Sequence, residues 1–107
     1  MSYRYMRLIV FFDLPTTTSE DLKIYRNFRK SLIKLGFYMF QESVYVKMVL
    51  NASVGKSVIS KVEQLKPDRG LVQLITVTER QFQNIITFTG EQTSEVLDTD
   101  ERTIILW

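Results

Sequence analysis

Residues 6–12 constrain the fold of this 107-residue chain more than any other segment. The segment is rich in β-branched and aromatic residues, carries apolar side chains on both faces of an extended strand, and stops at Asp13-Leu14-Pro15. A strand that is apolar on both faces belongs at the centre of a sheet. The sequence therefore predicts one domain built around this strand, because chains of this length rarely divide.

Two amphipathic helices and several further strands follow. Residues 16–19 offer N-caps for a first helix, whose apolar positions recur at helical spacing until Gly36. Strands are predicted at 37–40 and 43–50, with Gln41-Glu42 as the reversal between them. Asn51 or Ser53 caps a second helix that reaches residue 65, and a turn at 66–70 leads to a strand at 71–77. A short helical turn at Thr78-Glu79 precedes further strand candidates at 85–89 and 103–107.

The order β-α-β-β-α-β predicts an α+β, ferredoxin-like fold with extra C-terminal strands. Both helices of that fold cover one face of the sheet, yet the first and third strands carry apolar residues on both faces. A bare face of this kind would be a large apolar patch, and a second copy of the chain can cover it. We expect residues 1–89 to form the domain and residues 90–107 to form an acidic linker with a last strand. That strand would be exchanged onto the partner of a two-fold dimer through five residues: Thr103, Ile104, Ile105, Leu106 and Trp107.

The chain contains neither cysteine nor histidine. The absence of Cys excludes disulfides, thiolate nucleophiles and zinc ribbons, and the absence of His excludes the usual general base and most transition-metal sites. Reactive groups must therefore be carboxylates, hydroxyls, Lys, Arg or a hard metal held by oxygen. No apolar run is long enough to cross a bilayer, and no signal peptide is visible, so we expect a cytoplasmic protein without a membrane partner.

The net charge of +2 conceals a basic body and an acidic tail. Residues 1–88 carry +6 and residues 89–107 carry −4. On a helical wheel, the basic residues of the first helix gather within about 80°, opposite the apolar stripe. This ridge predicts contacts with phosphates, although a solvated basic face is the alternative. Its residues are Lys23, Arg26, Lys30 and Lys34, with Arg29 beside the stripe.

Asp13 is the candidate for chemistry. It ends the central strand, where it could also serve simply as a turn residue before Leu14-Pro15. A two-fold dimer would place two such carboxylates near the axis, and a divalent cation would relieve their repulsion. Such a cation can also activate a bound water.

Four segments, in order, resemble one known family. Residues 7–15 (RLIVFFDLP), 25–32 (YRNFRKSL), 36–37 (GF) and 41–45 (QESVY) are similar to the recurrent segments of the Cas2 family of small CRISPR-associated adaptation proteins. The resemblance covers roughly residues 6–88, and the acidic linker with its terminal strand most resembles members from type II systems. It implies a ferredoxin-like homodimer that bridges two dimers of the CRISPR integrase during spacer acquisition and holds the incoming prespacer duplex DNA.

The resemblance also implies a Mg²⁺-dependent endonuclease, with Mn²⁺ as a substitute, that acts on single-stranded RNA or on double-stranded DNA. Asp13 corresponds to the metal-binding and catalytic aspartate of the family. The alternatives are a non-catalytic DNA-binding scaffold, an RNA-recognition module and a small-molecule regulatory domain. An RNA-recognition module needs a Gly-rich basic motif on the third strand, which residues 45–49 lack. A regulatory domain needs Gly-rich loops at helix starts, where only Gly55 qualifies.

Overall fold

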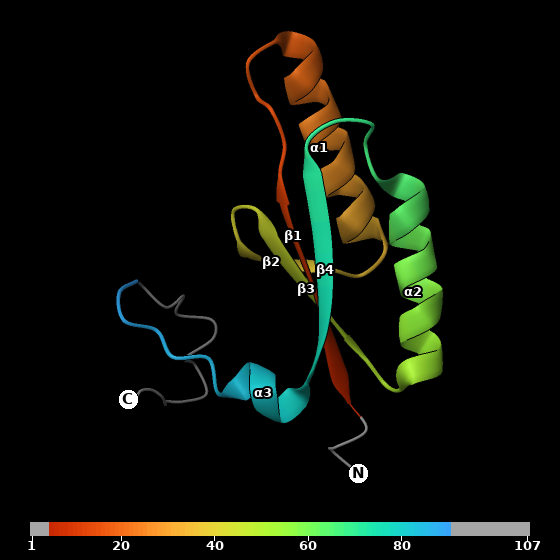
Figure 1. Cartoon of the computed structure of the whole chain (residues 1–107), viewed down its shortest axis with the longest axis vertical. Helices are drawn as coiled ribbons and strands as arrows, with labels where there is room; N and C mark the ends of the chain where they lie inside the picture. The colour runs from red at the N-terminus through yellow and green to blue at the C-terminus, as the bar shows by residue number, and fades with distance from the viewer. Residues whose placement is uncertain (1–4, 91–107) are drawn as a thin grey trace.

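The computed structural model describes residues 5–90 and arranges them in the predicted order. The elements are β1 (Met6–Asp13), α1 (Ser19–Lys34), β2 (Tyr38–Gln41), β3 (Val44–Val49), α2 (Ala52–Leu65), β4 (Leu71–Thr78) and α3 (Glu79–Gln83). The sheet has the strand order β2-β3-β1-β4, and all three neighbouring pairs are antiparallel. The α+β, ferredoxin-like arrangement is confirmed for these residues, with β1 in the interior and α1 and α2 on one face (Figure 1).

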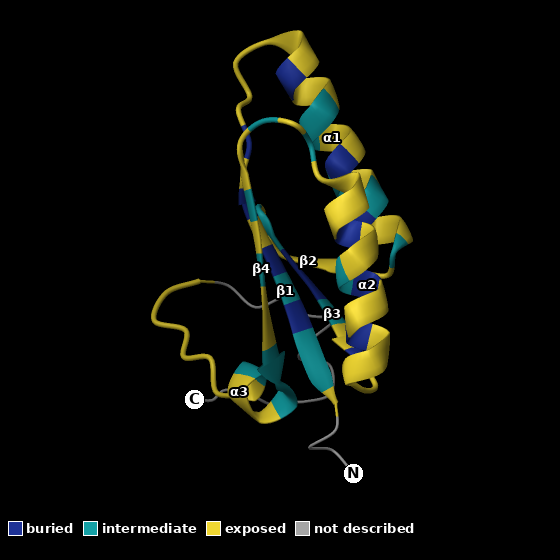
Figure 2. Ribbon diagram, turned by 45° about the vertical axis from the view of Figure 1, so that its right-hand side comes forward, coloured by how far each residue is buried: buried dark blue, intermediate teal, exposed yellow. Residues whose placement is uncertain are grey.

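The core lies between the sheet and the two long helices. Leu8, Val10 and Phe12 alternate along β1 as buried residues, whereas Ile9 is half-buried and Phe11 is exposed. The buried set packs on side chains from α1 and α2, which are Phe28, Leu32, Val58 and Val62. Figure 2 shows the resulting asymmetry, because the two long helices, α1 and α2, cover the same side of the sheet.

Local signals explain where the helices begin and end. The Thr18 hydroxyl accepts a hydrogen bond from the Asp21 backbone N–H at 3.0 Å, and the Asp21 carboxylate accepts one from the Thr18 N–H, which closes a capping box. At the other end Gly36 has φ +102°, and a Cβ there would meet the Lys47 Nζ atom at 2.6 Å. The start of α2 is capped by Asn51, whose side-chain oxygen accepts from the Val54 N–H at 2.9 Å.

The C-terminal part of the described chain departs from expectation. The predicted turn at Thr78-Glu79 is the start of a five-residue helix, α3, which Thr78 caps. The strand predicted at 85–89 is wrong for the described residues, which form no strand there. A strand requires a partner, and this segment runs away from the sheet instead of pairing with it (Figure 1). The expected acidic linker and the exchanged strand at 103–107 lie outside the described residues.

No helix within residues 5–90 is both long and apolar enough to cross a membrane.

Candidate nucleic-acid interface and carboxylate site

Asp13 is the last residue of β1, and it is exposed. In the sheet it lies opposite Leu71, the first residue of β4. Since side chains alternate along a strand, Asp13 shares a face with Phe11 and Ile9, which is the face opposite α1 and α2. On the other flank, the Phe12 N–H donates to the Ser43 carbonyl at 3.1 Å, so the β2–β3 turn lies against the same strand end.

The connection from β1 to α1 is braced by the loop before β4. Gly70 has φ +78°, and a Cβ there would lie 2.7 Å from the Asp13 carbonyl oxygen, so only glycine fits without a shift. Next to it, the Arg69 Nη1 atom lies 3.0 Å from the Asp21 carboxylate. The Thr18 backbone N–H and the Arg69 guanidinium lower the pKa of Asp21. The loop thus holds both ends of the connection that follows Asp13.

A complete metal site is not formed by one copy of the described chain. Within residues 5–90, no three carboxylate, His or Cys side chains gather in one place. Asp13 offers one exposed carboxylate that forms no ion pair in this part of the chain. A Mg²⁺ ion binds proteins through one or two carboxylates and keeps several waters. The residues therefore fit Mg²⁺ or Mn²⁺ only when a second copy or a phosphate supplies further oxygen ligands.

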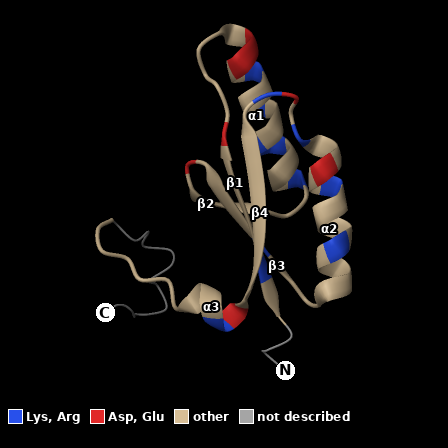
Figure 3. Ribbon diagram, in the orientation of Figure 1, with Lys and Arg blue, Asp and Glu red and all other residues tan. Residues whose placement is uncertain are grey.

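The basic ridge of α1 is present as predicted. Figure 3 shows Lys and Arg along α1, beyond the acidic residues of its first turn. The ridge consists of four exposed side chains, none of which forms an ion pair with the described residues: Lys23, Arg26, Lys30 and Lys34. The buried residues Phe28 and Leu32 lie on the opposite side of the helix. The ridge therefore faces away from the sheet.

Arg29 lies beside the ridge and is anchored to the core. Its Nε atom donates to the Tyr45 hydroxyl at 2.7 Å, and its guanidinium carbon is 6.0 Å from the centre of the Tyr25 ring. The hydrogen bond to Tyr45 raises the pKa of Arg29. This bond also satisfies the polar end of a buried aromatic residue, whose ring stacks on Phe12 at 5.9 Å. Arg29 thus has a structural partner that the ridge residues lack, and its phosphate contact stays a prediction.

The structure does not bring Asp13 and the ridge together. Asp13 lies on the sheet face opposite α1 and α2, whereas the ridge lies on the outer side of the helix layer. The sheet and the helices stand between them. A straight duplex on the ridge would therefore not reach the Asp13 carboxylate of the same copy.

The face of the sheet opposite α1 and α2, which we call the open face, is largely apolar. Its exposed side chains include Phe11, Tyr38, Phe40, Met48, Leu71 and Ile75. Arg7 is the cation on this face that comes from a strand, and it is paired with Glu79 at 2.7 Å. Lys47, opposite Leu8 in the sheet, belongs to the helix-covered face. Exposed aromatics without free cations on the strands do not form an RNA platform, which counts against the RNA-recognition alternative.

Gly55 does not open a ligand loop. It is buried in α2, and a Cβ there would make ordinary contacts with Val49 and Leu8. An alanine would therefore also fit at this buried helix position, which offers no support for a small-molecule regulatory domain.

Sequence reasoning missed two ion pairs that join distant segments. These are Arg7 with Glu79, which are 72 residues apart, and Arg69 with Asp21, which are 48 residues apart. The spacing of residues in the sequence does not predict such long-range pairs. One weaker indication is that Arg7 interrupts an otherwise apolar central strand, where a charged side chain needs a partner.

Comparisons with known proteins agree with the geometry. The family model for CRISPR associated protein Cas2 matches residues 6–85. A protein of Treponema denticola named CRISPR-associated endoribonuclease Cas2 is 50% identical over 101 residues, which are 94% of this chain and all of that protein. Proteins with the same name from Ligilactobacillus salivarius and Streptococcus mutans are 44% and 43% identical; the match covers 94% of this chain in both cases, and 100% and 93% of those proteins.

The fold is similar as well. A structure titled "Crystal structure of cas2" superposes with a TM-score of 0.57, covering 94% of this chain and 99% of that one at 14% identity. At this level of identity the structural likeness supports the fold alone. The sequence matches span most of the chain and of the related proteins. The chain therefore belongs to the Cas2 family of CRISPR-associated proteins.

Proposed function

We propose that this protein acts in CRISPR adaptation as a two-fold dimer that binds the prespacer duplex DNA and works with the CRISPR integrase. The observation that carries the DNA-binding part is the ridge of α1, with four exposed cations that have no acidic partner in the described chain. Like charges at i,i+4 destabilise a helix slightly, so a one-sign ridge is unfavourable unless a polyanion neutralises it. Phosphate contacts would bind duplexes of any sequence.

The open face supports the dimer. Apolar patches of this kind on a small domain indicate a protein interface, and a two-fold partner presents the same patch. The outer edge of β4 supports the exchange of the last strand. Beside that edge a groove of about 290 Å³ is lined mainly by Ile59, Val62, Val72 and Leu74. The last strand, residues 103–107, would pair with β4 of the partner. Its alternate side chains, including Trp107, would then enter the corresponding groove of the partner.

We also propose metal-dependent phosphodiester hydrolysis at Asp13. The related proteins are named endoribonucleases, and Asp13 is an exposed carboxylate at the strand end where two copies would approach their axis. When bound, Mg²⁺ or Mn²⁺ would neutralise phosphate charge and lower the pKa of a bound water. Asp13 would hold the ion, and the braced connection behind it would limit movement of the carboxylate. The substrate would be single-stranded RNA or double-stranded DNA.

A non-catalytic scaffold is the second candidate. The position of the ridge favours it, because a duplex held there lies on the opposite side of the domain from Asp13. In this alternative the duplex is held for integration, and Asp13 acts only as a turn residue or a metal-binding residue.

A cleavage assay of the wild type and of Asp13→Ala distinguishes the nuclease from the non-catalytic scaffold. Purified wild type, Asp13→Ala and Glu63→Gln would be incubated with single-stranded RNA and duplex DNA, with Mg²⁺ or with EDTA. The Glu63 side chain is an exposed carboxylate on α2 and serves as the matched control. The nuclease proposal expects EDTA and Asp13→Ala to abolish cleavage while Glu63→Gln keeps it.

The same variants would be assayed for spacer acquisition in cells that contain the integrase. If Asp13→Ala still acquires spacers and the wild type shows no cleavage, the nuclease proposal fails and the scaffold proposal stands. Loss of acquisition on neutralising the ridge would support DNA binding in either case.

A further inference from the structure

Arg7 is the centre of a network on the open face. Its Nε and Nη2 atoms lie 2.7 and 3.1 Å from the two carboxylate oxygens of Glu79, and its Nη1 atom donates to the Tyr38 hydroxyl at 2.8 Å. Its guanidinium carbon lies 4.3 Å from the centre of the Phe82 ring. The Arg7 and Glu79 side chains are only 13% and 21% exposed. A bidentate, stacked arginine of this kind is oriented from every side.

The network attaches α3 to the sheet. A helix of five residues has almost no stability by itself, so its position must come from contacts outside it. Glu79 binds Arg7 from the first turn, and the Gln83 Nε2 atom donates to the same carboxylate at 2.7 Å. On the same face of the helix, Phe82 packs on Phe40 of β2 with ring centres 5.4 Å apart. These contacts join α3 to β1 and β2 on the open face, at the end of the sheet where β1 begins and β4 ends.

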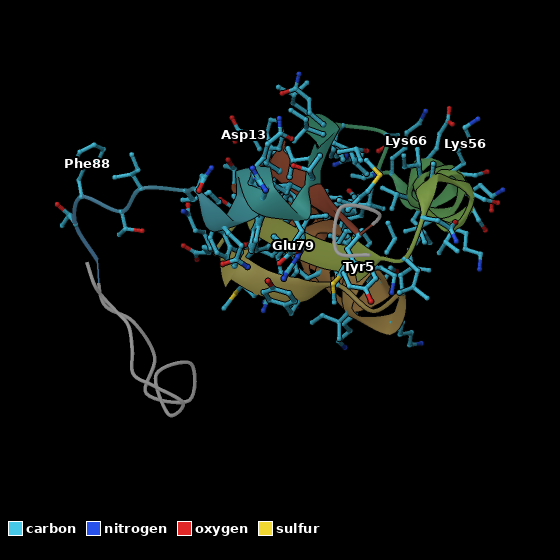
Figure 4. All side chains as sticks on the ribbon, turned by 90° about the horizontal axis from the view of Figure 1, so that it is seen from below. Tyr5, Asp13, Lys56, Lys66, Glu79 and Phe88 are labelled. Carbon is cyan, nitrogen blue, oxygen red and sulfur yellow. The ribbon has the colours of Figure 1, made fainter. Side chains whose placement is uncertain are left out.

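The chain beyond α3 therefore leaves the open face from a fixed point. Residues 85–88 run away from the body of the domain, where Ile86 is 74% exposed and Phe88 is 91% exposed (Figures 1 and 4). Fully burying such a side chain stabilises a protein by about 1.5–3 kcal/mol, so their exposure indicates a missing partner.

These two apolar side chains follow directly on α3, which lies on the open face. The second copy that would cover this face in the proposed dimer would therefore lie beside them.

We propose that Arg7 is a positioning residue for dimer formation: by fixing α3 on the open face, it directs the exposed side chains of Ile86 and Phe88 toward the second copy. This inference rests on the proposed dimer. Arg7 acts through Glu79 and Phe82 and need not contact the partner. A merely structural Arg7 would stabilise each copy without affecting how these two side chains contribute to the dimer.

A double-mutant cycle on the full-length chain distinguishes these roles. Sedimentation would give the dimer dissociation constants of wild type, Arg7→Gln, Phe88→Ala and the double variant. We expect Arg7→Gln to raise the constant at least tenfold, and Phe88→Ala to have a smaller effect in the Arg7→Gln background than in the wild type. Arg7→Lys, which keeps the charge but loses the fork, should be intermediate. Arg80→Gln, on the exposed side of the same helix, is the matched control and should not differ from wild type.

Other outcomes are equally decisive. If wild type is a dimer and Arg7→Gln dimerises as tightly, or if the two substitutions are additive, the positioning role is wrong while the dimer stands. If the wild type is a monomer at micromolar concentration, the proposed dimer itself fails. Should Arg7→Gln unfold because Glu79 is left unpaired, the variant Arg7→Gln/Glu79→Gln removes both charges and is measured in its place.

Discussion

The outer surface of the helix layer and the open face of the sheet differ in kind. On α1, four cations stand exposed without acidic partners in the described chain, opposite the buried stripe. On the open face, the cation contributed by the strands, Arg7, is bound by Glu79 and Tyr38, and the surroundings are apolar. Unpaired exposed cations attract phosphates at low desolvation cost, whereas apolar area gains by excluding water. The domain thus presents one surface suited to a nucleic acid and another suited to a second copy of itself.

A charge placed on the open face should have the largest effect. Ile75 is exposed in the single copy and lies opposite Ile9, so Ile75→Asp should not disturb the core. In the proposed dimer the new carboxylate would be buried without a partner, which costs on the order of 3 kcal/mol or more and raises the dissociation constant more than ~100-fold. Sedimentation measures this change. Val54→Asp, a comparable substitution on α2, is the control, and equal effects of the two would argue against the open face as the interface.

Neutralising the ridge should have the next largest effect. With Lys23, Arg26, Lys30 and Lys34 changed to Gln, the slope of log affinity for duplex DNA against log salt should fall by about 0.9 for each phosphate that the variant no longer neutralises. The decrease in affinity should be similar for unrelated DNA sequences. Lys56→Gln/Lys61→Gln on α2 serves as the control, with a smaller expected change. A quadruple variant with unchanged affinity and slope would show that the ridge is only a solvated face.

The ion pair of the open face should make stability depend on pH. The hydrogen bond from Arg7 lowers the pKa of Glu79, so the stabilisation is present above the unfolded-state pKa of about 4.3 and is lost as the pH falls below it. Glu79→Gln should lower the free energy of unfolding at pH 7 by about 1.5–3 kcal/mol. The difference from wild type should shrink between pH 5 and pH 3 in urea titrations at one protein concentration. Glu42→Gln, which changes an exposed acid in the β2–β3 turn, is the control for the loss of one negative charge.

The smallest effect is expected when a substitution on one surface is tested for the function assigned to the other. Because Asp13 lies on the opposite side of the sheet from the ridge, Asp13→Ala should leave the salt dependence of duplex binding unchanged. Conversely, the quadruple ridge variant should still cleave a short single-stranded RNA at the wild-type rate if the wild type cleaves it. Filter-binding and single-turnover assays test both halves. A loss of duplex affinity in Asp13→Ala would mean that one nucleic acid contacts both sites.

Much of the fold could be predicted because its signals are local. The alternation along residues 6–12, the capping residues before α1 and α2, and Gly36 at a positive φ each act over a few residues. The ridge is equally local, since a helix turns by about 100° per residue and places the four cations together whatever the tertiary structure. For the same reason Asp13 could be assigned to the end of a central strand.

Other features depended on which distant segments meet. The strand predicted at residues 85–89 had a suitable composition but no neighbour in the described chain, and a strand without a neighbour is not stable. In the sequence Arg29 looks like another basic residue of the ridge. Its hydrogen bond to Tyr45 forms only because α1 packs on β3, so the sequence could not predict it.

The sequence by itself determined the order of the elements, the position of Asp13 and the charge of the outer helix surface. Only the tertiary structure decided that Arg7 binds Glu79 and that Arg69 binds Asp21, because these pairs join residues 72 and 48 positions apart. It also decided that the ridge and Asp13 lie on opposite sides of the sheet. The physical reason is that backbone periodicity acts over one or two turns of chain, whereas ion pairs and the faces of layers exist only after the chain has been brought together.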